Sequence, residues 1–219
     1  MTLSSAEMRA YYAVRAPYYD DVYLKPERRA DIAFLREHLP ARVAGRTTLE
    51  VACGTGFWTQ FLATRARRLV ATDATPEPLE FARRRPNVEQ VAFVQADAYA
   101  LGPELGTFDA AFAGLWFSHV PREGRDAFLH SLHARLAPGA RVVFLDNSSV
   151  QCLEHPIVET DAHGNTYQQR RLKDGSMHRV LKNFPTEAEL RALLEPLAAR
   201  CAFRALDNFW LVEYALPAA

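Results

Sequence analysis

An apolar run, a carboxylate and two closely spaced glycines stand together in TLEVACGTGFW, from Thr48 to Trp58. This order is typical of a β-strand that feeds a glycine loop and then a helix. Glycine leaves room for backbone to approach a ligand and for the helix to pack closely on the strand. Farther along, the apolar run Leu69–Thr72 ends in Asp73, whose carboxylate can accept hydrogen bonds from a ribose diol. Strand, loop, helix, second strand and terminal acid, in this order, predict a site for an adenosyl cofactor.

A histidine, His119, follows another apolar run, Phe108–Gly114, at the predicted carboxyl edge of the sheet. Open α/β sheets bind their ligands at this edge. An unperturbed imidazole titrates at about pH 6.5, which suits proton abstraction at neutral pH. We therefore consider His119 a candidate general base, with a structural or cofactor-contacting histidine as the alternative. Trp116 and Phe117, just before it, are candidates for the pocket wall or for the core.

The N-terminal segment is rich in tyrosine, and its physics suits a lid over the cofactor. Aromatic rings supply apolar surface and their hydroxyls can reach a polar ligand. The expected contacts are Tyr12 and Tyr19. The alternative is an amphipathic helix packed on the sheet edge, with Tyr11, Tyr18 and Val22 buried.

Helical and strand patterns alternate through the first two-thirds of the chain, which predicts right-handed crossovers and a mostly parallel, doubly wound sheet. The expected strands lie near Thr48–Ala52, Leu69–Thr72, Val91–Gln95, Phe108–Gly114 and Arg141–Leu145. The expected helices lie near Ser5–Tyr19 (capped by Ser4 or Ser5), Pro26–His38, Phe57–Arg65, Pro76–Arg85 and Arg122–Leu136. Leucine spacing and the Pro138-Gly139 breaker define the last of these helices.

The last third departs from this rhythm. Two extended runs, Asn165–Leu172 and Met177–Lys182, flank an Asp-Gly turn and predict a β-hairpin after the fifth strand. A helix near Thr186–Ala199 follows, and the link between the final strands, Ala202–Leu206 and Trp210–Ala215, is too short for a helical crossover. The prediction is a single α/β domain, 1–219, with a seven-stranded Rossmann-like sheet in which one strand is antiparallel. An N-terminal helical cap (1–40) and a substrate-side insertion (150–183) complete it.

The composition fits one enzyme-like domain. The chain has 219 residues, 49% of them hydrophobic, and can bury a substantial core. Basic and acidic residues balance at 26 each, so the bulk charge offers no attraction for nucleic acid or an anionic membrane. No run is long and apolar enough to span a bilayer. Three widely spaced cysteines suggest a reducing compartment, and the expected location is cytoplasmic.

The predicted hairpin carries the candidates for acceptor binding. Strand alternation sends Tyr167 and Arg171 to one face and Arg170 to the other. An arginine that faces the pocket would suit a carboxylate or phosphate on the acceptor. The equally weighted alternative is an edge hairpin charged against aggregation or used in dimer contacts.

These motifs together resemble the class I S-adenosylmethionine-dependent methyltransferases, in particular the small-molecule members, over roughly Tyr11–Leu216. The run from Glu50 to Gly56 matches the first motif, with Ala52 where glycine is commoner. The segments Gln95–Ala98 and Leu136–Ala140 match the motifs after the third strand and before the fifth.

The resemblance implies S-adenosyl-L-methionine as cofactor. It assigns cofactor contacts to Tyr12, Tyr19, Glu50, Ala52, Gly54, Thr55, Gly56, Trp58, Asp73, Ala74, Asp97, Ala98 and Leu115, and acceptor contacts to Trp116, Tyr167 and Arg171. Simpler roles stay open for four of these residues. Glu50 could be an ion-pair partner, Asp73 a helix cap, Asp97 a turn former and Trp58 a core side chain.

Metal-dependent methyltransferases resemble this chain at Asp146-Asn147, after the fifth strand. They also need an acid after the fourth strand, where this chain has Ser118 and His119. Because hard cations prefer oxygen ligands, we expect no metal.

Three functions remain to be separated. The first is methyl transfer to a small-molecule acceptor by a monomer or homodimer. The second is nicotinamide-dependent oxidoreduction, which would want a third small residue where Trp58 and Thr59 stand. The third is a non-catalytic cofactor-binding or interaction protein, since fold does not determine function. Methylation of nucleic-acid amino groups is disfavoured, because Gly114–Phe117 lacks the expected Pro-Pro-aromatic motif.

Overall fold

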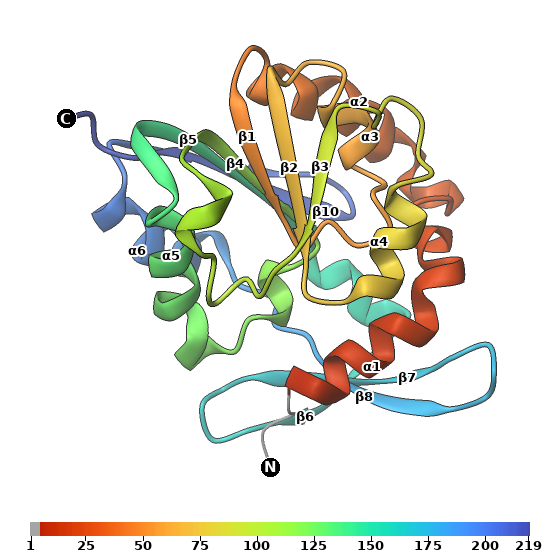
Figure 1. The fold of residues 1–219 in the computed structure, drawn as a ribbon. Coiled ribbons are helices and arrows are strands. Elements are labelled where there is room, and N and C mark those ends of the chain that lie inside the picture. Colours follow the sequence, from red (N-terminus) through yellow and green to blue (C-terminus); the bar gives the residue numbers. More distant parts are fainter. Residues whose placement is uncertain (1–4) are drawn as a thin grey trace.

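The computed structural model describes residues 5–219, and Ser4 lies outside them. Its main layer is a seven-stranded sheet flanked by helices (Figure 1). In spatial order the strands are β3 (Val91–Gln95), β2 (Arg68–Asp73), β1 (Thr47–Val51), β4 (Phe108–Gly114), β5 (Leu136–Asn147), β10 (Phe209–Ala215) and β9 (Arg200–Ala205). Helices α2 (Arg29–Val43), α3 (Thr59–Leu62) and α4 (Pro76–Ala82) lie on one side in Figure 1, and α5 (Arg125–His133) and α6 (Glu187–Leu194) on the other.

The strand directions confirm the predicted sheet. Strands β3, β2, β1, β4 and β5 pair in parallel, whereas β10 runs antiparallel to both β5 and β9. The chain order reverses between β1 and β4, which is the switch point at which doubly wound sheets bind ligands. The ends of β1, β2 and β4 therefore frame the region that the sequence predicts as the site.

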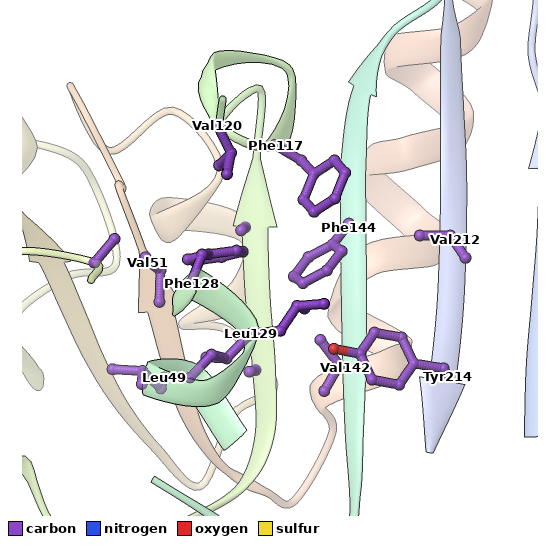
Figure 2. Packing of buried hydrophobic residues seen from close by; sticks show 14 of the residues in the cluster. Leu49, Val51, Phe117, Val120, Phe128, Leu129, Val142, Phe144, Val212 and Tyr214 are labelled. Carbon is purple, nitrogen blue, oxygen red and sulfur yellow. The ribbon is translucent and has the colours of Figure 1, made fainter. Parts of the chain in front are cut away.

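Two apolar layers hold the sheet between its helices. Side chains alternate along β4, so that Ala111 packs toward α5 and Phe112 toward α2. Figure 2 shows the first layer, in which Phe117 and Phe144 stack with ring centroids 5.3 Å apart beside Phe128 of α5. Burying one such ring contributes about 1.5–3 kcal/mol, so this layer fixes the carboxyl edge rigidly.

Several predicted helices are shorter in the structure. Helix α1 covers Ser5–Arg15, and a 3-10 helix η1 (Ala16–Val22) with Pro17 at its start replaces the predicted continuation to Tyr19. Helix α5 ends at His133, not at Leu136. Leu136 pairs with Phe108 and already belongs to β5, so the Pro138-Gly139 breaker lies within an irregular stretch of strand.

The predicted hairpin is part of a second sheet of three strands, β6 (Ile157–Thr160), β7 (Thr166–Arg171) and β8 (Met177–Leu181). Strand β6 was not expected from the sequence, because its polar and apolar residues do not alternate and all four are exposed. Helix α1 lies against this sheet in Figure 1. Among residues 5–219, we find no helix with the length and apolar character needed to cross a membrane.

Candidate active site

A cavity of about 260 Å³ opens at the carboxyl ends of β1, β2 and β4. The glycine loop forms its floor, α1 and η1 form one wall, and the second sheet contributes the end that contains Tyr167 and Leu181. The predicted site residues in its lining are Tyr12, Tyr19, Ala52, Gly54, Thr55, Asp73, Ala74, Asp97, Ala98, Leu115, Trp116, His119 and Tyr167. Residues far apart in the sequence thus converge on one cavity.

The glycine loop takes its shape from three residues with positive φ: Ala52 (53°), Gly54 (56°) and Gly56 (74°). A Cβ on Gly54 would meet no atom within 4 Å, so this position leaves open space beside the cavity. A Cβ on Gly56 would lie 2.9 Å from Ala82 of α4. Gly56 therefore allows α4 to pack on the loop and does not line the cavity. Ala52 adopts a conformation that glycine takes at lower cost, which marks the departure from the family motif as a strained one.

Asp73 both braces the loop and faces the cavity. Its carboxylate accepts hydrogen bonds from the backbone N–H of Gly54 at 2.9 Å and of Thr75 at 2.8 Å. Asp97 likewise accepts from the Tyr99 N–H at 2.9 Å, so it forms a turn and lines the cavity at once. For both acids the structural role and the predicted ligand role are compatible, because a carboxylate has lone pairs for several donors.

Glu50 lies beneath the loop and does not line the cavity. It is 2% exposed, and its Oε2 has no hydrogen-bond partner among residues 5–219. Burial, and secondly the Asp73 carboxylate, raise the pKa of Glu50 to about 8. The side chain is therefore protonated at neutral pH, with an unpaired oxygen under the loop.

This raised pKa predicts a pH-dependent difference in stability between the wild-type chain and Glu50→Gln. Because the folded pKa lies above the unfolded value of about 4.3, the contribution of Glu50 is present below pH 4 and is lost as pH rises through 8. From pH 5 to pH 8, we expect the wild-type free energy of unfolding to fall relative to that of Glu50→Gln by on the order of 3 kcal/mol. Denaturant unfolding of both chains at several pH values measures this, and parallel curves would contradict it.

The N-terminal wall is tied to the glycine loop through Asp20 of η1. The Asp20 carboxylate accepts a hydrogen bond from Thr55 Oγ1 at 2.7 Å and forms an ion pair with Arg85. Arg85 Nε in turn donates to the Thr55 backbone carbonyl at 2.9 Å. On the same wall, Tyr12 and Tyr19 face the cavity, their ring centroids 5.9 Å apart. The contacts of Asp20 and Arg85 fasten the N-terminal wall to the glycine loop.

His119 is buried at the cavity wall and hydrogen-bonded through both ring nitrogens. Nδ1 lies 2.6 Å from the Leu181 carbonyl oxygen, and Nε2 lies 2.6 Å from the Tyr12 hydroxyl. A carbonyl oxygen only accepts, so Nδ1 carries the proton and the lone pair of Nε2 accepts from Tyr12. Burial, followed by the charges of Lys182 and Arg170, lowers the pKa of His119 well below its usual value. The imidazole is therefore neutral at pH 7, with its lone pair directed at the Tyr12 hydroxyl.

Next to His119, the candidate metal ligand Asp146 is fully engaged by protein donors. Its carboxylate accepts from Ser118 N and Ser118 Oγ, both at 2.8 Å, from Asn147 N at 2.8 Å and from Lys182 Nζ at 2.9 Å. Lys182 is 1% exposed and follows β8 directly. An ammonium ion thus stands where the metal-dependent pattern would place a cation.

Four predicted site residues lie outside the cavity lining: Glu50, Gly56, Trp58 and Arg171. Trp58 is a core residue, packed edge-on against Tyr23 and Phe57 on the α2 side of the sheet. Arg171 is exposed and its neighbour Arg170 is buried, because the strand turns Arg170 toward the interior. Sequence alternation identified the two faces of β7 but not how far each is covered, since Tyr167 on the face of Arg171 is fully buried.

Other residues of the site were missed. Met8, Ala16, Thr75, Pro78, Ala96, Tyr99, Gly114, Pro121 and Leu181 also line the cavity. Asp20 and Lys182 do not line the cavity, but they hold residues beside it through hydrogen bonds to Thr55 and Asp146. A lysine at the end of the apolar run Val180-Leu181 was the one signal available for Lys182, whereas nothing in the sequence links Asp20 to Thr55.

The cavity suits an adenosyl ligand. Asp73 and Asp97 present acceptors for hydroxyl and amino groups, and Pro78, Ala98 and Leu115 supply apolar surface. The indole Nε1 of Trp116 is buried and has no hydrogen-bond partner among residues 5–219.

Known proteins share this architecture. A family model described as a methyltransferase domain matches residues 48–139. A demethylmenaquinone methyltransferase of Clavibacter sepedonicus is 37% identical over 112 residues, which are 50% of this chain and 44% of that protein. A ubiquinone biosynthesis O-methyltransferase of Azotobacter vinelandii is 30% identical over 116 residues, which are 52% of this chain and 48% of that protein. The chain spans about half the length of these curated relatives.

Solved structures also match over nearly the whole chain. The DhpI–SAM–HEP complex covers 99% of this chain and 100% of its own, with a TM-score of 0.80 and 29% sequence identity. The domain match, the strand order and the glycine loop with its following acid all point to the same fold, that of a methyltransferase. The chain is thus similar to S-adenosylmethionine-dependent methyltransferases in its strand order and in its glycine loop.

Proposed function

We propose that this chain transfers the methyl group of S-adenosylmethionine to a small-molecule acceptor, with His119 as the group that receives the acceptor's proton. The observation that carries the proposal is the convergence of Gly54, Asp73 and His119 on one cavity. Two curated relatives are named as a demethylmenaquinone methyltransferase and a ubiquinone biosynthesis O-methyltransferase, and the DhpI complex holds SAM and HEP. These names support a small acceptor. The methyltransferase-domain match argues against the oxidoreductase alternative, and turnover would exclude the non-catalytic one.

The residues divide the work of binding between the loop and the acids. We assign the backbone of Gly54, which leaves open space at the cavity, to the cofactor, and Asp73 to its ribose hydroxyls. Asp97 and the apolar wall of Ala98 and Leu115 suit the adenine. When bound, the cofactor supplies an electrophilic methyl group on a sulfonium, so the protein's task is alignment of the acceptor and exclusion of water.

Proton removal fits the geometry of His119. Its Nδ1–H is held by the Leu181 carbonyl, so Nε2 is the accepting atom. In the closed cavity the Tyr12 hydroxyl donates to Nε2, and an acceptor hydroxyl or amine can take that place. The proton that the acceptor loses then binds Nε2. The lowered pKa keeps His119 unprotonated and ready at pH 7, at the cost of a weaker base.

The remaining expectations belong to the same proposal. The three-stranded sheet of residues 157–181 contributes Tyr167 and Leu181 to the acceptor end, which supports its assignment as the substrate-side insertion of a single domain. The mechanism needs no metal, because Asp146 already accepts from an ammonium and three further donors. We propose a cytoplasmic monomer or homodimer that does not act on nucleic acid.

The test is turnover. The chain, incubated with S-adenosylmethionine labelled in its methyl group and a metabolite extract, should yield a labelled product of low mass, and the yield should survive a chelator. Label in nucleic acid, or no label in any product, would contradict the proposal. Activity lost to the chelator and restored by magnesium would overturn the metal-independent mechanism.

A further inference from the structure

Three basic side chains are buried between the second sheet and the carboxyl edge of the main sheet. Arg28, Arg170 and Lys182 are 3%, 5% and 1% exposed. They come from the 3-10 helix η2 (Pro26–Arg28), from β7 and from the residue after β8. Lys182 forms an ion pair with the buried carboxylate of Asp146 at 2.9 Å. Within residues 5–219, neither arginine has such an ion pair.

Within residues 5–219, the hydrogen-bond partners of both guanidinium groups are neutral. Arg170 Nη2 donates to the amide oxygens of Gln168 at 2.6 Å and Gln151 at 3.3 Å. Arg28 Nη1 donates to Asn147 Oδ1 at 3.1 Å, and its Nε has no partner among residues 5–219. Neither arginine has a carboxylate within 4 Å in that part of the chain. Buried charges are normally paired, because desolvation of an isolated ion costs several kcal/mol. Arg170 therefore carries a buried positive charge that no hydrogen-bonded carboxylate among the described residues balances, whereas the charges of Glu154 and Glu27 act on Arg28 from farther away.

This charge lies directly beside the reacting end of the cavity. Lys182 Nζ donates to Ser118 Oγ at 2.6 Å, and Ser118 precedes His119 in the chain. The carbonyl that holds His119 Nδ1 belongs to Leu181, the residue before Lys182. Arg170 acts on the pKa values of Tyr12, Tyr19 and His119, all of which line the cavity. The cations thus stand behind the wall formed by these three side chains.

We infer that the acceptor carries a small oxyanionic group, a phosphonate, phosphate or carboxylate, which binds Arg170 and Lys182 while its nucleophilic atom faces His119. This inference rests on the proposed function. The Tyr12 hydroxyl occupies His119 Nε2, so an acceptor that takes this place displaces that hydroxyl. The planar guanidinium of Arg170 can then donate two parallel hydrogen bonds to the oxyanion.

A purely structural role is the competing explanation. Arg170 and its two glutamines tie β7 to the segment that contains Gln151, and Lys182 ties β8 to Asp146. Loss of such a tie lowers stability but does not alter the binding of one class of ligand. The two explanations therefore differ in the binding of anions by folded protein.

The experiment is a calorimetric titration of the chain, saturated with S-adenosylhomocysteine, with methylphosphonate, inorganic phosphate and acetate, and with ethanol as the neutral probe. At least one anion should bind, and ethanol should not. Arg170→Gln should weaken that binding about tenfold or more, with Arg170→Lys between the two. Arg171→Gln, one residue along on the exposed side of β7, is the matched control and should bind like the wild type. All folded variants should keep their affinity for S-adenosylhomocysteine.

A second measurement covers the case in which Arg170→Gln does not fold. In the wild-type chain, an oxyanion beside His119 stabilises its imidazolium, so the anion should raise the pKa of His119 seen by NMR, whereas ethanol should not. Equal anion affinity in folded Arg170→Gln, or no anion binding and no His119 shift in wild-type chain that binds S-adenosylhomocysteine, would overturn the inference. Failure of S-adenosylhomocysteine itself to bind would instead overturn the proposed function.

Discussion

Replacement of His119 by alanine should lower the maximal rate of methyl transfer by about 10²–10⁴-fold, the usual contribution of a positioned general base. The affinity for S-adenosylmethionine should change little, because the loop and the acids that we assign to the cofactor lie on β1, β2 and β3. Steady-state kinetics with the acceptor found in the turnover assay, together with cofactor titration, measure both quantities.

The control for this prediction is Tyr12→Phe, which removes the hydroxyl that donates to Nε2 but keeps the ring. This variant should retain most of the rate, because the acceptor replaces Tyr12 at Nε2 in the reacting complex. If His119→Ala lowers cofactor affinity and rate together, His119 is a cofactor contact. If neither changes, it is a structural histidine.

Removal of the residues before Asp20 should weaken cofactor binding by about tenfold or more, equivalent to about 1.4 kcal/mol. The truncation deletes Met8, Tyr12, Ala16 and Tyr19 from the cavity wall and exposes the ligand to water. The sheet should remain folded, because its two apolar layers contain none of the deleted residues except a contact to Tyr19.

Two point variants separate the lid from general packing. Tyr19→Ala removes a ring that faces the cavity, whereas Val14→Ala shortens an exposed side chain on the same wall of the molecule. We expect weaker cofactor binding for Tyr19→Ala and unchanged cofactor binding for Val14→Ala. Circular dichroism and thermal unfolding check that both variants are folded. A truncated chain with unchanged affinity and rate would show that the tyrosine-rich segment only packs against the sheet.

Much of the fold could be predicted, because local sequence patterns indicate where its helices and strands lie. Apolar runs and the short link before Trp210 predict the strands and their directions once the crossover rule is applied, whereas the spatial order of the strands comes from the structure. The same signals placed Asp73, Asp97 and His119 at the carboxyl edge, since each follows a strand. Strand β6 was not predicted, because it is exposed on both faces and therefore has no apolar alternation. Its pairing with β7 is also irregular.

The site was predicted less completely, because several of its features depend on tertiary contacts. Gly56 and Trp58 belong to the loop motif, but one packs against Ala82 and the other against Tyr23. Neither of these two packing contacts can be predicted from the spacing of residues in the sequence. The exposure of Arg171 has a similar cause, because only the folded chain shows that the cover over Tyr167 does not reach Arg171 at the end of β7.

The most direct test of the central claim is calorimetric titration of the wild-type chain and Asp73→Ala with S-adenosylmethionine and with a nicotinamide dinucleotide. Because Asp73 faces the cavity and also accepts a hydrogen bond from the Gly54 N–H, Asp73→Ala should lose at least tenfold in cofactor affinity, about 1.4 kcal/mol. The variant should remain folded. The account predicts that the wild type binds S-adenosylmethionine and does not bind the dinucleotide. Tight binding of the dinucleotide, or equal affinity of wild type and Asp73→Ala for S-adenosylmethionine, would contradict it.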